Sequence, residues 1–489
     1  MTGKINNIKT TTVARNSIKK CRIWFSCILL FAVNIAFKKP PVDSIINESR
    51  PNVIIILTDD QGYEDVGFNG CTDIPTPNID RIATAGVVFR NAYVSYAVCA
   101  PSRAGLITGR YQDRFGYSRN PLYKPLDPEI GLSLNEQMLQ ELLVKADYNT
   151  MGIGKWHLGA HEQYRPWNRG FNEFFGFIGG GHRYFPTDYN IANQDSARNE
   201  AESYRTKLVR NGKVVEESEY LTDALSREAV SFVERNKHQP FFLYLAYNAP
   251  HAPLQATEKY LNRFLNIQDP KRRTYAAMIS AVDDGVGLLL NKLQELNLDE
   301  NTIVIFLSDN GGPENDNSSN NGSLRGSKGS LYEGGIRVPF AIQWPRIIKP
   351  GSEYHESIIS LDIFATVTAN IKGLPAPKNS LDGVNLIPYL QGLKKGSPHE
   401  YLFWRQFDQK NYAVLHSSGN KEIIIRDSSL FLYHLKKDIS EEINLAEKSN
   451  HWIRRMEKER KKWEAATIPP AFYGLNQEAQ YNSDKKLKQ

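Results

Sequence analysis

The chain has 489 residues, of which 41% are hydrophobic and 11% aromatic, a composition typical of a folded globular protein that excludes a wholly disordered chain. Its formal net charge of +6 is concentrated at the start, because the first forty residues carry eight Lys or Arg and no Asp or Glu, which leaves −2 for the rest. A nearly neutral body lacks the broad basic surface that nucleic-acid binding needs, so we expect no nucleic-acid partner.

Residues 1–40 are predicted to be a signal peptide and leader. After Lys19, Lys20 and Arg22 comes IWFSCILLFAVNIAF, an apolar run of about fifteen residues, which Lys38 follows. This pattern is typical of a secretory signal, and the run is shorter than the ~20 residues of a membrane span. An uncleaved N-terminal anchor is the alternative. In both cases the remaining chain is exported, to the periplasm or the medium, and we expect no stable membrane partner.

From residue 51 onward, β and α patterns alternate. NVIIIL, PFFLYLAY and TIVIFLS are apolar runs typical of buried parallel strands, and YNTMGIG is a further short strand. Helical patterns stand between them: TPNIDRIATAG, SLNEQMLQELLVKA capped by Ser133, TDALSREAVSFVERN, and RTYAAMISAVDDGVGLLLNKLQEL. The alternation predicts an α/β fold over residues 50–375, with a large, mixed but mostly parallel sheet sandwiched by helices.

The pattern changes over residues 376–475. EYLFWRQ, NYAVLHSS, KEIIIRD and SLFLYHL are short strand patterns separated by turn signals, and NHWIRRMEKERKKWEAA is one charged amphipathic helix. We therefore expect a small C-terminal subdomain made of an antiparallel sheet and a terminal helix. Residues 476–489 are polar and are expected to form a loose tail.

Polar residues follow two of the buried strands at the point where each strand ends. Asp59 and Asp60 come after NVIIILT, and Asp309 and Asn310 come after TIVIFLS. Ligands of parallel α/β sheets bind at the carboxyl ends of the strands, and adjacent carboxylates repel unless a cation neutralises them. Asp59 and Asp60 alone are compatible with a solvated turn. Together with the second strand end they form a set of hard oxygen ligands, which favours Ca²⁺ or Mg²⁺ over zinc.

Three further motifs place basic groups near the same sheet edge. In GKWHLG, Lys155 and His157 are two apart and face one side of an extended segment. In NAPHAPL, prolines hold His251 directly after a strand, and in RGSKGS a glycine-rich loop presents Lys328. Each motif taken alone is also compatible with a structural histidine or a surface lysine. Together they suit binding of an anion and transfer of a proton.

The two cysteines beyond residue 30 pose a question. Cys71 and Cys99 would form a disulfide in the simplest interpretation of an exported chain. However, Cys99 precedes Arg103 at a predicted helix start, a setting in which a thiolate is activated as a nucleophile. A thiol is a poor ligand for a hard metal ion, because calcium prefers oxygen ligands.

The stretch CAPSRAGLITGR, residues 99–110, resembles the signature C-x-P-S-R-x-x-x-[ST]-G-R of the formylglycine-dependent (type I) sulfatases of the alkaline phosphatase superfamily. The other motifs follow in the order of that family, from residue 51 to RGSKGSLYEGGIRVP and beyond. One departure is Asp147–Tyr148, where the family often has Gly-Tyr, and it affects packing at a strand entrance. In the family a maturase oxidises the cysteine to formylglycine, whose hydrate is the nucleophile. No signature surrounds Cys71, and we expect it to be a structural thiol.

The resemblance implies a set of calcium ligands. Carried over position by position, these are Asp59, Asp60, Asp309 and Asn310 together with the formylglycine made from Cys99. The fold it implies is alkaline-phosphatase-like.

The resemblance also implies catalytic roles. Arg103 and Lys155 would hold and polarise the aldehyde hydrate, and His157 would be the base that later breaks the hemiacetal. His251 and Lys328 would face the sulfate and its leaving oxygen, with His251 as the proton donor.

The expected substrate is a sulfated polysaccharide or its oligosaccharides, such as an algal galactan, ulvan or a glycosaminoglycan. In FIGGGHRYF, His182 and Arg183 are candidate sugar contacts, with a purely structural loop as the alternative. The loop PENDNSSNNGS and Arg405 are weaker candidates for the pocket lining. A phosphonate or phosphate ester hydrolase of the same superfamily is an alternative function. An inactive glycan-binding relative is another, although none of the reactive groups is missing from this chain.

Overall fold

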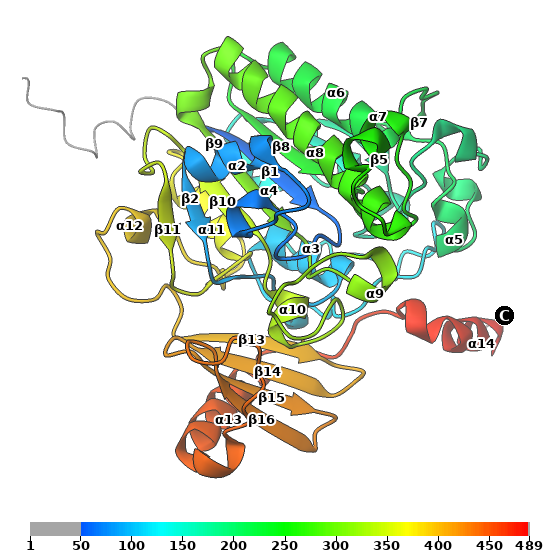
Figure 1. Cartoon of the computed structure of the whole chain (residues 1–489). Helices are drawn as coiled ribbons and strands as arrows, with labels where there is room; N and C mark the ends of the chain where they lie inside the picture. The colour runs from blue at the N-terminus through cyan, green and yellow to red at the C-terminus, as the bar shows by residue number, and fades with distance from the viewer. Residues whose placement is uncertain (1–49, 488–489) are drawn as a thin grey trace, which may run out of the picture. The chain divides into compact units, whose positions relative to one another are not determined.

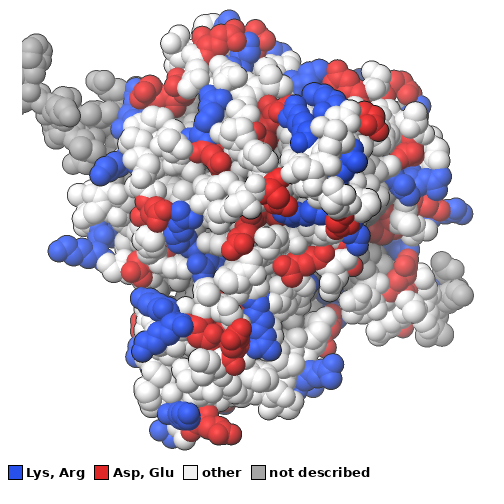
Figure 2. Space-filling view, viewed as in Figure 1, with Lys and Arg blue, Asp and Glu red and all other residues white. Residues whose placement is uncertain are grey.

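The computed structural model describes residues 50–487, so the predicted signal peptide and leader lie outside the described residues. The described residues form a single compact unit. Within the described range, every helix is too short or too polar to cross a bilayer. On the face shown in Figure 2, acidic and basic side chains are interspersed.

A mixed, mostly parallel sheet of ten strands forms the centre of the molecule (Figure 1), which confirms the predicted fold class. Its middle strands are parallel, whereas β10, β6 and β7 run antiparallel to their neighbours. In spatial order the strands are β11 (Ser352–Tyr354), β2 (Val87–Phe89), β10 (Phe340–Gln343), β9 (Thr302–Ser308), β1 (Asn52–Thr58), β8 (Phe241–Ala246), β4 (Asn149–Lys155), β5 (Glu173–Phe177), β6 (Val209–Arg210) and β7 (Lys213–Val214). The short strands β3 (Ala92–Tyr93) and β12 (Ile358–Ile359) form a separate pair.

Strand β1 shows why an all-apolar sequence suits this sheet. Its residues are buried, and alternate side chains enter different hydrophobic cores. Ile55 and Leu57 pack in the core that includes residues of α3, α4 and α11, whereas Ile54 and Ile56 pack in the core that includes residues of α2, α6 and α8. Helices therefore cover both faces of the sheet, as predicted.

The helices that precede the C-terminal antiparallel sheet range from one turn to 26 residues. They are α2 (Pro77–Thr84), α3 (Cys99–Thr108), α4 (Leu139–Val144), α5 (Glu200–Ser203), α6 (Leu221–Arg235), α7 (Glu258–Leu261), α8 (Pro270–Glu295), α9 (Glu314–Asn317), α10 (Glu333–Ile336), α11 (Asp362–Ala369) and α12 (Ile387–Leu390).

Helix α4 begins later than the sequence pattern predicts. The expected cap, Ser133, instead closes a turn by accepting a hydrogen bond from the Asn135 N–H at 3.2 Å. The Glu141 carboxylate accepts from the Met138 N–H at 2.9 Å and thereby caps the helix one turn further on. The prediction was wrong because two capping signals lie in the same stretch and the second one is used.

The C-terminal region forms the predicted antiparallel sheet and helix. Its strands pair in sequence order and are β13 (Tyr401–Gln406), β14 (Asn411–His416), β15 (Asn420–Ile425) and β16 (Ser429–His434), followed by α13 (Asn450–Glu464). The expectation of a loose tail from residue 476 was wrong, because α14 (Glu478–Leu487) forms there. The Tyr481 hydroxyl on this helix donates to Asp127 at 2.8 Å, and Lys124 lies 3.0 Å from Glu478.

Candidate active site

Parallel pairing brings the two predicted strand ends together. The register of β1 and β9 places Thr58 opposite Ser308, so Asp59 and Asp309 follow at the same level of the sheet. Oxygens of Asp59, Asp60 and Asp309 all lie within 4.8 Å of one another, and the three side chains are almost completely buried. The predicted carboxylate cluster therefore exists in the structure.

The backbone of Asp60, one of the three carboxylates, is in the left-handed conformation, with φ of 69°. Its Oδ1 accepts from Asn310 Nδ2 at 2.7 Å, and its Oδ2 accepts from Lys328 Nζ at 2.8 Å. Burial works to raise the pKa of Asp60, but the Lys328 ammonium and the His251 ring together hold that pKa well below its usual value. Asp60 is therefore ionised at any working pH.

Two oxygens of the cluster are orphaned. Asp59 Oδ1 and Asn310 Oδ1 are buried and have no hydrogen-bond partner among the described residues. Such atoms are costly in a folded protein unless a ligand satisfies them. Burial and, to a lesser extent, the neighbouring Asp59 carboxylate also raise the pKa of Asp309, so ionisation of this carboxyl is unfavourable without a further cation. The donor set of three carboxylates and one amide oxygen fits a hard divalent cation.

Helix α3 starts at Cys99 and places Arg103 one turn later, facing the same cluster. The Arg103 Nε donates to Asp309 Oδ2 at 2.8 Å. Burial raises the pKa of the Cys99 thiol to about 12, despite the opposing charges of Lys155 and Lys328. An unmodified Cys99 is therefore a protonated, weakly nucleophilic thiol. Cys71 and Cys99 are both free, so the simplest interpretation of a disulfide is wrong.

Lys155 and His157 both reach the site from the end of β4. The Lys155 ammonium lies 2.6 Å from Asp59 Oδ2 with both side chains fully buried. The His157 backbone is left-handed, with φ of 60°, and its carbonyl accepts from the Tyr117 hydroxyl at 3.1 Å. Neither ring nitrogen of His157 has a hydrogen-bond partner among the described residues. Burial and the nearby Lys155 ammonium hold its pKa well below the usual value, so the ring is neutral and able to accept a proton.

His251 follows β8 and is oriented by its own loop. Its Nδ1 lies 2.6 Å from the Ala252 carbonyl, and its Nε2 lies 3.7 Å from Asp60 Oδ2. Burial lowers the pKa of His251 to about 3, although Asp60 acts to raise it. The neutral ring thus donates from Nδ1 to the carbonyl and turns Nε2 toward the carboxylate cluster.

Of the two predicted sugar contacts, His182 and Arg183, the structure places His182 in the interior. His182 is fully buried, and both of its ring nitrogens lie 2.8 Å from backbone carbonyls, those of Arg183 and Thr206. Burial lowers its pKa to about 4. His182 therefore holds a loop in place, and its assignment as a substrate contact was wrong. Arg183 is half-buried and makes no side-chain hydrogen bond or ion pair with the described residues, so its role stays a prediction.

The two weaker candidates are structural. Arg405 is buried and donates to Asp113 at 3.1 Å and to the Ile468 carbonyl at 2.7 Å, which ties the C-terminal sheet to the catalytic region. In the loop PENDNSSNNGS, Asn317 is buried and donates to the Asp60 carbonyl at 3.1 Å. That loop therefore supports the carboxylate cluster through the backbone of Asp60.

Sequence reasoning missed two residues at the site. Gln406, at the end of β13, donates to the Gly329 carbonyl at 2.7 Å and so holds the loop that carries Lys328. Glu200, at the start of α5, accepts a hydrogen bond from the Gly180 N–H at 2.8 Å, beside His157. Neither residue stands in a recognisable motif, and only the fold brings them to the site.

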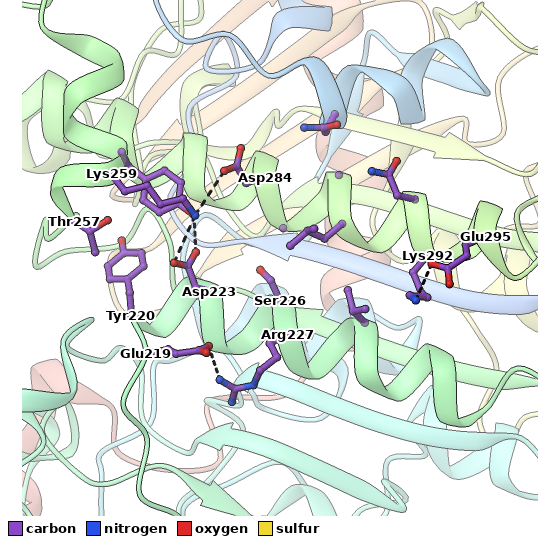
Figure 3. Close-up of a pocket in the computed structure, with 17 residues that line it drawn as sticks. Glu219, Tyr220, Asp223, Ser226, Arg227, Thr257, Lys259, Asp284, Lys292 and Glu295 are labelled. Carbon is purple, nitrogen blue, oxygen red and sulfur yellow. Dashed lines mark hydrogen bonds and ion pairs between the residues drawn. The ribbon is translucent and has the colours of Figure 1, made fainter.

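A cavity of about 1060 Å³ elsewhere in the molecule is lined by residues of α6 and α8 (Figure 3). Its charged groups pair with one another: Lys292 lies 2.8 Å from Glu295, and Arg227 contacts Glu219. The reactive groups described above do not line this cavity, so its size does not make it the active site.

Comparisons with known proteins agree with this geometry. A family model described as "Sulfatase" matches residues 51–371. N-acetylgalactosamine-6-sulfatase of Homo sapiens is 36% identical over 75% of this chain and 70% of its own length. The uncharacterized sulfatase YdeN of Escherichia coli is 31% identical over 77% of this chain and 73% of its own length. A solved structure, Ps i-CgsB in complex with k-i-k-neocarrahexaose, is 37% identical with a TM-score of 0.82, covering 90% of this chain and 97% of its own.

Proposed function

The chain belongs to the sulfatase family and is a sulfuric ester hydrolase, and on that premise we propose that it is exported and removes sulfate esters from galactose-type sugars of a polysaccharide or its oligosaccharides. The observation that carries the proposal is the buried cluster at the ends of β1 and β9. Its hard oxygen atoms lie beside the nucleophile position at residue 99 and beside three cationic side chains.

The charges of this cluster suit an anionic substrate. Three carboxylates are matched by three cations, which are Arg103, Lys155 and Lys328. A divalent cation would leave a net positive pocket, and a sulfate monoester carries one negative charge. Lys328 is the most exposed of the three cations, with 19% of its side chain accessible, and so lies nearest the entrance for an incoming sulfate. Desolvated positive charges of this kind stabilise the charge that develops on the sulfuryl oxygens.

We assign the calcium site to Asp59, Asp60, Asp309 and Asn310, since this set includes the orphaned oxygens Asp59 Oδ1 and Asn310 Oδ1. The bound cation and a formylglycine at position 99 supply the Lewis acid and the nucleophilic oxygen. Conversion of Cys99 removes a thiol that burial keeps protonated and supplies an oxygen donor in its place. A formylglycine-generating maturase is the partner that this conversion requires.

The protein's own side chains then orient the ester and move protons. Arg103 is fixed by its hydrogen bond to Asp309, and Lys155 by its contact with Asp59, so both present their charge without further reorganisation. Once the His251 ring is protonated, its Nε2 donates the proton to the leaving oxygen. An anionic ester bound beside this ring raises its pKa, because the anion favours the charged imidazole. His157, neutral and unpartnered, accepts the second proton.

The substrate class rests on the two relatives with informative names. One is named for N-acetylgalactosamine 6-sulfate, and the other holds a neocarrahexaose. Both ligands contain galactose-type rings, which differ from glucose-type rings in the axial oxygen at position 4. Among the candidates from sequence, we therefore favour a sulfated galactan or a galactosamine-containing glycosaminoglycan over ulvan.

A panel of defined sulfated oligosaccharides tests this proposal. Protein co-expressed with a maturase is incubated with galactose-type and glucose-type sulfates, an aryl sulfate and an aryl phosphonate, and released sulfate is measured by ion chromatography. We expect release from galactose-type substrates at least about tenfold faster than from glucose-type ones, because polar groups that pair with a hydroxyl in one position are left unpaired when it is in another. Faster turnover of glucose-type sulfates would overturn the substrate class, and faster turnover of the phosphonate would overturn sulfate specificity.

The Cys99→Ala variant is the matched control for the nucleophile. It should fold normally and release no sulfate, since a methyl group replaces the thiol in a buried site. The mass of the proteolytic peptide containing residue 99 reports whether the wild-type thiol became an aldehyde. An unmodified thiol in fully active protein would overturn the formylglycine assignment.

A further inference from the structure

Hydrolysis of a sulfate monoester near neutral pH releases one proton per turnover, so the base that collects this proton must pass it to solvent. His157 is only 4% exposed and cannot do so directly. The groups that border the His157 ring therefore decide how quickly the ring loses its proton after each turnover. The following inference rests on the proposed function, because it concerns the proton that this reaction delivers to His157.

The Glu200 carboxylate lies close to this ring. A Cβ added to Gly180 would lie 2.4 Å from Glu200 Oε1 and 2.6 Å from His157 Nε2. Both atoms are measured from the same Cβ position, so the distance between Glu200 Oε1 and His157 Nε2 is at most the sum of the two distances, about 5 Å. The Gly180 N–H donates to Glu200 Oε1 at 2.8 Å and fixes the carboxylate in this position. Glu200 retains some exposure to solvent, so it can exchange a proton that the buried ring cannot.

The two side chains share a small cavity. It has a volume of about 10 Å³, and its lining includes His157, Glu200, Tyr123 and Gly179. A single water molecule needs about this volume and at least two polar partners. The Tyr123 hydroxyl already donates to the Gln194 carbonyl at 2.8 Å, whereas the His157 ring nitrogens have no partner among the described residues. The imidazole and the Glu200 carboxylate are thus two polar groups that a water in this cavity can bridge. A Cβ at position 180 would collide with both Glu200 Oε1 and His157 Nε2, so the glycine there allows the two side chains to approach each other.

We propose that Glu200 is the proton acceptor that resets His157, and that it receives through one bridging water the proton that leaves the ring at Nε2. The proton passes from Nε2 to the water as the water's own proton passes to the Glu200 carboxylate. The carboxylic acid then releases its proton to solvent, which restores both groups. No oxidant or other reactant is required.

The charges around Glu200 suit this role. Burial raises its pKa to about 7, the Gly180 N–H and the Lys155 ammonium oppose the rise, and Glu478 on α14 adds to it. Glu478 is itself paired with Lys124 at 3.0 Å. A carboxyl with this pKa accepts and releases protons readily near neutral pH.

The test compares Glu200→Gln with Glu202→Gln. Glutamine still accepts the Gly180 hydrogen bond but cannot take up a proton. Glu202 lies two residues away and pairs with Arg198 at the surface, so its variant controls for a changed charge on α5. For Glu200→Gln we expect kcat to fall by about 10- to 100-fold with KM unchanged, and the acid limb of the pH–rate profile near pH 7 to disappear. Glu202→Gln should behave as wild type.

Two further measurements separate a proton role from a structural one. The ¹⁵N shift of His157 Nε2, measured in unmodified protein without substrate, should change in Glu200→Gln and stay unchanged in Glu202→Gln. Gly180→Ala keeps Glu200 but fills the gap, and should reduce kcat to a similar extent. Suppose that the wild-type protein cleaves sulfate esters and that Glu200→Gln has the same kcat, pH profile and Nε2 shift as wild type. That result would overturn the inference. Failure of wild type to cleave any sulfate ester would instead overturn the proposed function, while the Nε2 shift would still test the contact.

Discussion

Lys421 on β15 lies 2.8 Å from Glu333 on α10, and both side chains are fully buried. The same ammonium lies 2.9 Å from Glu441, and the second oxygen of Glu333 accepts from the Tyr93 hydroxyl at 2.8 Å. This charge network joins the C-terminal sheet to the segment that follows the Lys328 loop. The C-terminal region is thus part of the support of the active site.

Replacing Lys421 with Met should destabilise the protein strongly. The change removes the cation that pairs with the buried Glu441 and leaves Glu333 with Arg337 alone, 3.3 Å away. Breaking a buried ion pair in this way costs about 3–5 kcal/mol. The midpoint of urea unfolding measures the loss. Lys437→Met, at an exposed position, is the control and should be nearly neutral. Equal midpoints for the two variants would show that the network contributes little.

Calcium should stabilise the wild-type protein through the cluster at the strand ends. At calcium concentrations about 100-fold above Kd, we expect the Tm to rise by about 2–5 °C over the value in chelator. Asp309→Asn should abolish this rise, because it removes one charged ligand of the site. Asp316→Asn, an exposed acidic position on α9, should retain it. A calcium-dependent rise preserved in Asp309→Asn would remove Asp309 from the ligand set.

Glu422 on β15 should make the protein less stable as pH rises. It is 1% exposed, neither of its oxygens has a partner among the described residues, and burial raises its pKa from 4.5 to about 7 despite the opposing charge of Arg460. A carboxyl with a raised folded-state pKa binds its proton more tightly when folded. Its stabilising contribution is therefore complete below pH 4.5 and is lost as pH rises through about 7.

Glu422→Gln removes this titration. The variant should be more stable than wild type by up to about 3 kcal/mol at pH 8 and nearly equal to it at pH 4.5. Urea unfolding at several pH values measures the difference, and Glu442→Gln at an exposed site provides the comparison. A pH-independent difference between Glu422→Gln and wild type would contradict the shift.

The sequence predicted those parts of the site that follow from strand position. Asp59 and Asp309 end neighbouring parallel strands, and buried apolar runs make such strands recognisable. His182 was misassigned because local sequence does not show that both of its ring nitrogens meet backbone carbonyls. Glu200 and Gln406 were missed because they reach the site only through contacts with residues distant in the chain. Tertiary packing decides these roles, and one sequence does not display it.

His251 should matter most for substrates with a basic leaving oxygen. Its Nε2 faces the cluster, while Nδ1 is engaged with the Ala252 carbonyl. A sugar alkoxide needs a proton as it leaves, whereas a nitrophenolate is stable without one. His251→Ala should therefore reduce kcat about 10²- to 10⁴-fold on a sugar sulfate and far less on 4-nitrophenyl sulfate.

His157→Ala and His238→Ala complete this comparison. The loss of His157 should slow both substrates to a similar extent, because that ring handles a proton after the alcohol has left. The exposed His238 should have no effect on either substrate. Steady-state rates on the two substrates give the ratio that decides the roles. Equal losses on both substrates for His251→Ala would show that it binds the sulfate group without protonating the leaving oxygen.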